Sequence, residues 1–232
     1  MNTVAEKVAS YLLDIKAIKL EPTHPFTWAS GWKSPIYCDN RKTLSYPEVR
    51  SYIKEQFAAL IREKYPQAEV IAGVATGAIA QGVLVAQELG LPFIYVRSSA
   101  KSHGLENLIE GEYKAGQKVV VIEDLISTGG SSLQAVEALR NAECEVLGMV
   151  AIFTYGFQKA EDNFKNASCE LTTLSNYNAM IDLAVKVGYV QADQVQKLKE
   201  WRLSPETYKA EVKELMAKFQ SEGMSEEESK AK

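Results

Sequence analysis

The most informative stretch of the chain is Val119-Val-Val-Ile-Glu-Asp-Leu-Ile-Ser-Thr-Gly-Gly-Ser-Ser132. Its first four residues are β-branched and apolar, which predicts a strand buried on both faces. The predicted strand ends in two adjacent carboxylates, Glu123 and Asp124, and a Ser/Thr/Gly turn then leads into an apolar-periodic helix. Backbone N–H groups in such a turn, together with the helix dipole, favour a phosphate. Carboxylates suit sugar hydroxyls and hydrated Mg²⁺ instead. We therefore expect a ligand that combines a sugar diol, a phosphate and a metal.

An ordinary turn between a strand and a helix is the alternative explanation of this stretch. Ser, Thr and Gly are favoured at helix N-termini for purely structural reasons. Two like charges side by side at the end of a buried strand, however, are costly unless a partner compensates them. The adjacent carboxylates therefore favour a binding site over a simple cap.

The composition of the chain restricts its class. With 232 residues, 46% of them hydrophobic, the chain can bury one sizeable α/β core. A net charge of −4 argues against nucleic acid as the main partner. No apolar run approaches the ~20 residues of a membrane span, and the N-terminus predicts a helix, not a signal peptide. Three scattered cysteines and two histidines argue for free thiols in a reducing cytoplasm and against a zinc site.

Predicted strands and helices alternate from residue 70 to residue 153, a pattern typical of a doubly wound, mostly parallel α/β sheet. We expect four regions along the chain. They are a hood with an N-terminal helix over 1–45, the α/β core over 46–175, C-terminal helices over 176–220, and a disordered tail over 221–232.

Capping patterns predict where several helices begin. Thr3-x-x-Glu6 begins a helix that runs to about Ile18, and Ser45-x-x-Glu48 begins another that runs to about Lys64. Ser175 is expected to cap a helix that ends near Gly188. Two further helices are expected to begin at Asp193 and at Ser204-Pro205, and their role stays open.

Residues 97–116 form a long segment with little apolar periodicity. Such a segment inside a compact domain is usually either a lid or a solvated surface loop. Lys101 and His103 supply two potential cations within three residues, and three glycines interrupt the segment. Next to an acidic diol site, a mobile cationic loop would be a suitable partner for a diphosphate.

Three segments together resemble the orotate phosphoribosyltransferases. Residues 26–41, Phe-Thr-Trp-Ala-Ser-Gly-Trp-Lys-Ser-Pro-Ile-Tyr-Cys-Asp-Asn-Arg, are similar to their N-terminal hood. Residues 96–104 and 109–111 are similar to their flexible catalytic loop, and 119–132 to the diphosphate-sugar motif of all type I phosphoribosyltransferases. The resemblance covers roughly residues 1–190. It implies a type I phosphoribosyltransferase core with a small hood and additional C-terminal helices.

The resemblance also implies a reaction: Mg²⁺-dependent transfer of the 5-phosphoribosyl group from phosphoribosyl diphosphate to orotate. The products would be orotidine 5′-phosphate and diphosphate, in de novo pyrimidine (UMP) biosynthesis. The implied enzyme is a glycosyltransferase that works as a homodimer with shared active sites, the loop of one subunit reaching its neighbour. Mg²⁺ would be held mainly through the diphosphate sugar, with no direct protein ligand.

The resemblance assigns the site residues as well. Lys101, His103 and Asp124 are the expected catalytic residues, and Ser127 is expected to contact orotate. The expected binding residues for phosphoribosyl diphosphate are Arg97, Lys101, His103, Glu123, Asp124, Leu125, Ile126, Ser127, Thr128, Gly129, Gly130 and Ser131. Within this set, Glu123 and Asp124 hold the ribose hydroxyls, and residues 127–131 hold the 5′-phosphate.

The chain departs from some family members at positions where they carry cations. It has Ala29, Thr76 and Ser98 at three such places, and Thr154-Tyr155-Gly156 where some members have an arginine after the 146–153 strand. How the orotate carboxylate is held therefore stays open. The sequence leaves two alternative functions: a transcriptional ligand sensor, which would need a basic DNA-binding face, and the same transfer to a purine base, which the hood segment argues against.

Overall fold

A computed structural model of the chain describes residues 3–22, 24–28, 31–98 and 108–206. Its centre is a six-stranded sheet in the order β10-β9-β8-β5-β6-β7. All neighbouring pairs are parallel except the edge pair β6–β7, which is antiparallel. The strands are β5 (Val70–Val74), β6 (Phe93–Val96), β7 (Ile109–Glu110), β8 (Lys118–Ile126), β9 (Glu145–Thr154) and β10 (Leu171–Asn176).

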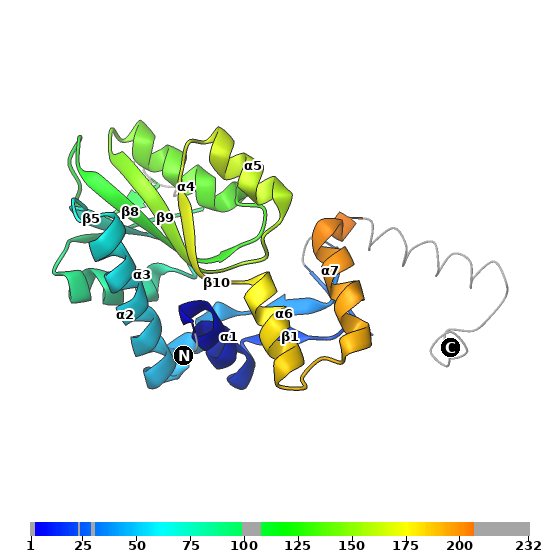
Figure 1. Cartoon of the computed structure of the whole chain (residues 1–232). Helices are drawn as coiled ribbons and strands as arrows, with labels where there is room; N and C mark the ends of the chain where they lie inside the picture. Colours follow the sequence, from blue (N-terminus) through cyan, green and yellow to red (C-terminus); the bar gives the residue numbers. More distant parts are fainter. Residues whose placement is uncertain (1–2, 23, 29–30, 99–107, 207–232) are drawn as a thin grey trace.

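Helices cover both faces of this sheet (Figure 1). On one face, α2 (Pro47–Lys64) and α3 (Ile79–Leu89) pack with alternate strand residues such as Ile71, Val120 and Ile122. On the other face, α4 (Gly130–Asn141) and α5 (Gln158–Asn166) pack with the intervening residues. Because successive strand residues point to opposite faces, a sheet covered on both sides needs apolar runs without alternation. The predicted doubly wound α/β fold is confirmed.

A second layer lies beside the carboxyl ends of the strands and includes the predicted hood. It contains α1 (Val4–Asp14), the antiparallel pair β1 (Ile18–Leu20) and β4 (Ile36–Cys38), and the small pair β2 (Phe26–Thr27) and β3 (Lys33–Ser34). The 3₁₀ helix η1 (Asn40–Ser45) leads from β4 into α2. The helices α6 (Tyr177–Lys186) and α7 (Val195–Leu203) and the short 3₁₀ helix η2 (Ala192–Gln194) complete the layer. Figure 1 shows α1, α6 and α7 grouped around β1.

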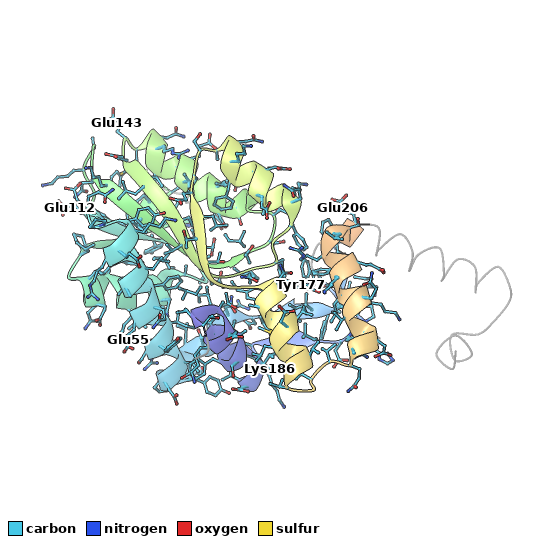
Figure 2. The ribbon with its side chains drawn as sticks, viewed as in Figure 1. Glu55, Glu112, Glu143, Tyr177, Lys186 and Glu206 are labelled. Carbon is cyan, nitrogen blue, oxygen red and sulfur yellow. The ribbon has the colours of Figure 1, made fainter. Side chains whose placement is uncertain are left out.

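Aromatic side chains join α6 and α7 to the hood. Trp201 of α7 is 1% exposed and lies 5.4–6.0 Å, between ring centroids, from the rings of Trp28, Tyr155, Phe157 and Tyr177. Tyr177, labelled in Figure 2 at the start of α6, donates its hydroxyl to the carbonyl of Leu198 at 2.9 Å. The C-terminal helix is therefore part of the packed structure and closes the hood against the core.

Three of the expected helix limits are wrong. Ser45 does not cap the second helix, because it ends η1, and α2 begins at Pro47 after Tyr46, an N-cap residue without a side-chain hydrogen bond. The first helix ends at Asp14, because Lys16 has a positive φ of 55° and Ile18 already pairs with Cys38 in a strand. Ser175 does not cap α6, since it is a fully buried strand residue whose hydroxyl donates to the carbonyl of Ala5. The neighbouring Asn176 is the cap, and its side chain accepts from the N–H of Ala179.

The segment 97–116 is also not a loop throughout. Ile109 and Glu110 form the edge strand β7, paired with Val96 and Tyr95. Residues 99–107, which include Lys101 and His103, lie outside the described part of the chain. The helix expected from Ser204-Pro205 and the tail over 221–232 extend beyond Glu206, the last described residue, which is labelled in Figure 2. The four-region division stays a prediction.

Cys38, Cys144 and Cys169 are all free thiols. In the described ranges, no helix combines the length and the apolar character needed to cross a membrane.

Candidate active site

The acidic pair lies inside a strand, not after one. β8 continues through Ile126, so Glu123 and Asp124 are strand residues, and Glu123 is in register with Ala151 of β9. The expectation that the strand ends at the pair is therefore wrong. The reason is that β9 is also a long strand and continues to pair with β8 up to Thr154, which is in register with Ile126. A central strand flanked by pairing partners holds both carboxyl groups in fixed positions.

Glu123 is buried and completely held by its neighbours. The residue is only 5% exposed. Its Oε2 accepts a hydrogen bond from the hydroxyl of Ser132 at 2.7 Å, and its Oε1 accepts one from the backbone N–H of Asp124 at 2.9 Å. Burial, and then the neighbouring Asp124 carboxyl, raise the pKa of Glu123 from 4.5 to about 8, while Ser132 partly opposes this shift. At neutral pH this carboxyl therefore retains a proton.

Asp124 faces a cavity of about 360 Å³ at the carboxyl edge of the sheet. The cavity is bounded by three parts of the chain: the acidic pair of β8, the turn after β5, and the end of β4. Its lining residues are Cys38, Asp39, Arg41, Val74, Ala75, Thr76, Gly77, Glu123, Asp124, Leu125 and Ser131. Gly77 touches the Asp124 carboxylate so closely that a Cβ atom at position 77 would lie 2.5 Å from Cγ of Asp124. The turn can approach the carboxylate only because residue 77 is glycine.

The hood is connected to the acidic strand by a short chain of hydrogen bonds. Asn40, 2% exposed, donates Nδ2 to the backbone carbonyl of Asp124 at 2.6 Å, and Cys38 donates its thiol to Oδ1 of Asn40 at 3.2 Å. Burial and the nearby Asp124 raise the pKa of the Cys38 thiol well above its usual value, so it stays protonated. These contacts fix the distance between the hood and the cavity.

The expected phosphate turn connects β8 to α4. Gly129 has a φ of 80° and is the N-cap residue of α4, which carries no side-chain cap. The N–H groups of an uncapped first turn are available to an anion. Asn163 of α5 donates to the carbonyl of Thr128 at 2.9 Å and so holds the turn. A Cβ at Gly129 would lie 2.6 Å from the ring of Phe164, which explains glycine at this position in packing terms as well.

Arg97 lies at the base of the β6–β7 hairpin. Its backbone N–H donates to the carbonyl of Leu108 at 2.8 Å, and its guanidinium lies 3.5 Å from a carboxylate oxygen of Glu110. It lines a separate cavity of about 240 Å³ that shares Val74, Ala75 and Ser131 with the acidic cavity. The structure thus brings Arg97, residues 123–125 and Ser131 to one edge of the sheet. Ile126 to Gly130 follow on the same connection.

Several residues around this site were not among the expected ones. Ser132 was within reach of sequence reasoning, because it follows Glu123 by nine residues in the same motif. Asn40 and Gly77 were not, since they belong to other segments, Asn40 being 84 residues from Asp124. Among the described residues that line the cavity, Asp39 is the only acidic residue besides the pair, and its carboxylate lies 2.7 Å from the guanidinium of Arg41.

Comparisons with known proteins agree with this geometry. A family model described as a phosphoribosyl transferase domain matches residues 43–187. The orotate phosphoribosyltransferase of Porphyromonas gingivalis is 64% identical over 208 residues, which cover 90% of this chain and 99% of that protein. The chain belongs to the orotate phosphoribosyltransferase family. The family predicted from residues 26–41, 96–111 and 119–132 is confirmed.

Other orotate phosphoribosyltransferases are similar as well. The one from Lactococcus lactis is 51% identical over 208 residues, covering 90% of this chain and 100% of that protein. The crystal structure of the one from Aeropyrum pernix superimposes with a TM-score of 0.69 at 24% identity, covering 79% of this chain and 99% of that chain. At that identity the match supports the fold, and the roles of individual site residues stay predictions.

Proposed function

We propose that this chain transfers the 5-phosphoribosyl group of 5-phospho-α-D-ribose 1-diphosphate to a ring nitrogen of orotate. The products are orotidine 5′-phosphate and diphosphate, and the step belongs to pyrimidine biosynthesis. The observation that carries the proposal is the cavity at the carboxyl edge of the sheet, where the acidic pair stands beside an uncapped helix N-terminus. An open α/β sheet binds ligands at this edge.

The acidic pair is suited to the ribose diol. Carboxylates accept hydrogen bonds from hydroxyls, and the Asp124 carboxylate lines the cavity while Glu123 is held behind it by Ser132. Asp124 is therefore assigned to the ribose hydroxyls and to the positive charge that develops on the sugar as diphosphate leaves. Glu123 orients Asp124 and shares a proton with it.

The turn over residues 127–131 is assigned to the 5′-phosphate. Its glycine at position 129 and the free first turn of α4 provide N–H donors without a side-chain cap. Holding the phosphate and the diol at two separate points would fix the orientation of the ribose for attack by the acceptor. Catalysis then needs charge stabilisation on the leaving group and no protein nucleophile.

The residues at the cavity fit Mg²⁺ that arrives with the diphosphate sugar. Mg²⁺ is usually bound through one or two carboxylates, substrate phosphates and water. Within the described ranges no group of three or more His, Cys, Asp or Glu side chains could hold a metal by itself. Asp124 is the residue that would contact the hydrated ion, which neutralises charge on the diphosphate when bound. Arg97, Lys101 and His103 are assigned to the same leaving group.

The test is an assay of diphosphate release by the purified protein. Orotate, hypoxanthine and adenine are compared as acceptors, each with Mg²⁺ and with excess chelator. We expect diphosphate release with orotate as the acceptor and not with hypoxanthine or adenine. The chelator should abolish this release, and added Mg²⁺ should restore it. Release with a purine base and not with orotate would contradict the proposal.

A further inference from the structure

A third cavity, of about 270 Å³, lies between the phosphate turn and the C-terminal helix α7. Its wall includes Thr128 of the turn, the aromatic side chains of Trp32 and Phe157, and the cations Lys159 and Arg202. Thr128 directly follows Ser127, the residue expected to contact the acceptor. This cavity therefore lies against the phosphate turn, next in the chain to the residue expected to contact the acceptor.

The position of Arg202 is fixed by the packing of α7. The preceding residue, Trp201, is buried in the aromatic cluster of the hood and donates its indole N–H to the carbonyl of Lys33 at 3.2 Å. Arg202 itself donates Nη1 to the carbonyl of Gly156 at 3.2 Å. Gly156 has a φ of 67°, and a Cβ at this position would lie 3.2 Å from the same nitrogen. Glycine at position 156 therefore leaves the space that the guanidinium uses.

Arg202 differs from the other arginines near the site in its partners. Arg41 pairs with Asp39, and Arg97 lies 3.5 Å from Glu110. Among the residues that the structure describes, no carboxylate lies within 4.0 Å of the Arg202 guanidinium, although Glu206 also lines the cavity. A guanidinium has five N–H donors in a planar fork that matches a carboxylate. One backbone carbonyl leaves most of these donors for a ligand.

We infer that Arg202 binds the carboxylate of orotate and so makes α7 part of the acceptor site. The inference rests on the proposed function, because it takes orotate as the acceptor. Orotate is a flat ring with one carboxylate, and the cavity offers flat aromatic walls from Phe157 and Trp32 beside the guanidinium. The carboxylate distinguishes orotate from uracil, so Arg202 is also the residue that selects between them.

A phosphate oxygen of the donor could use the same guanidinium, since Thr128 belongs to the phosphate turn. Steady-state kinetics with both substrates separates the two ligands. The variant is Arg202→Gln, which removes the charge but keeps an amide that can donate to the carbonyl of Gly156. Lys199→Gln is the matched control, because it removes one charge from an exposed position on the same helix that does not line the cavity.

For Arg202→Gln we expect KM for orotate to rise about 10- to 100-fold, the usual effect of losing a charge-assisted hydrogen bond. KM for the donor should stay within about 2-fold, and selectivity for orotate over uracil should fall by the same factor as orotate affinity. Arg202→Lys should lie between the wild type and Arg202→Gln, because it keeps the charge and loses the fork. Lys199→Gln should change KM for orotate by less than about 3-fold. Thermal unfolding of each variant checks that α7 remains packed.

Each contrary result has a separate meaning. A rise in donor KM with unchanged orotate KM would assign Arg202 to the phosphate and overturn the inference. Unchanged kinetics in Arg202→Gln would also overturn it. A wild-type protein that forms no product with orotate would instead overturn the proposed function, and the assignment of Arg202 to orotate with it.

Discussion

Glu123 and Asp124 are adjacent in the chain but lie in different surroundings. Both line the cavity, but Glu123 is 5% exposed and bonded to Ser132, whereas Asp124 is only half-buried and touches Gly77. Burial disfavours the charged form of a carboxyl group, so the buried member of the pair keeps the proton. The other member is left to meet the ligand. The two acids therefore divide the work of positioning and binding.

The proton on Glu123 makes the stability of the protein depend on pH. The pKa is about 8 in the folded chain against an ordinary 4.5, so the folded state binds more protons than the unfolded state between these values. The free energy of unfolding should therefore fall as pH rises from about 4.5 to about 8. Glu123→Gln cannot titrate and should remove this fall, which is on the order of 5 kcal/mol for a shift of this size. Urea unfolding of both proteins from pH 5 to 9 measures it, and parallel curves would contradict the assignment.

A second prediction at this scale concerns the close approach of Gly77 to Asp124. Gly77→Ala places a Cβ against the carboxylate and should displace it, which raises KM for the donor about 10- to 100-fold. Gly82→Ala is the control, because its Cβ would meet the ring of Phe93 at 2.6 Å and not the acidic pair. The control should lower stability with little change in donor KM. Equal donor KM values in the two variants would contradict the role given to the contact between Gly77 and Asp124.

Among the elements, α7 has the widest influence on the site. It is a short helix of nine residues with no side-chain cap, so it is not stable in isolation. Its stability comes from burying Leu198 and Trp201, both at most 1% exposed, against the hood and α6. The same contacts place Arg202 at the carbonyl of Gly156. The packing of α7 and the position of its arginine are therefore linked.

Trp201→Ala tests this link at the level of stability. Removal of a fully buried tryptophan leaves a cavity among four aromatic rings and should lower the free energy of unfolding by about 3–5 kcal/mol. Leu203→Ala, two residues further on the same helix and 74% exposed, should change it by less than about 0.5 kcal/mol. Chemical unfolding gives both values. A loss below about 1 kcal/mol for Trp201→Ala would mean that α7 does not pack as described.

At the scale of the whole molecule, the sheet carries the acidic pair on the central strand β8 and ends at one edge in the antiparallel pair β6–β7. The β6–β7 pair is closed at its base by a hydrogen bond from the backbone N–H of Arg97 to the carbonyl of Leu108. The expected homodimer with shared sites stays a prediction.

Subunit mixing tests the shared sites. Lys101→Ala should lower turnover about 10- to 100-fold, since it removes a charge-assisted contact to the leaving group. A cradle variant, Asp124→Asn with Gly129→Val, should be inactive for a different reason. If the loop acts across the interface, mixed dimers pair one intact loop with one intact cradle and recover activity. Subunit exchange is verified with a mass tag. Mixed dimers that stay inactive would show that the loop serves its own subunit.

The amino-acid sequence alone determined the fold class, the family and the position of the acidic pair. These depend on local patterns: apolar runs such as 119–122, glycine-containing turns, and a motif within 14 consecutive residues. Only the tertiary structure decided where the first helix ends, because pairing of Ile18 with Cys38 overrides helical periodicity. It also decided that Asn40 holds Asp124 from 84 residues away and that Arg202 lies against Gly156 from 46 residues away. Contacts of this kind depend on how finished elements pack, and packing across long separations leaves no periodic signal in the chain.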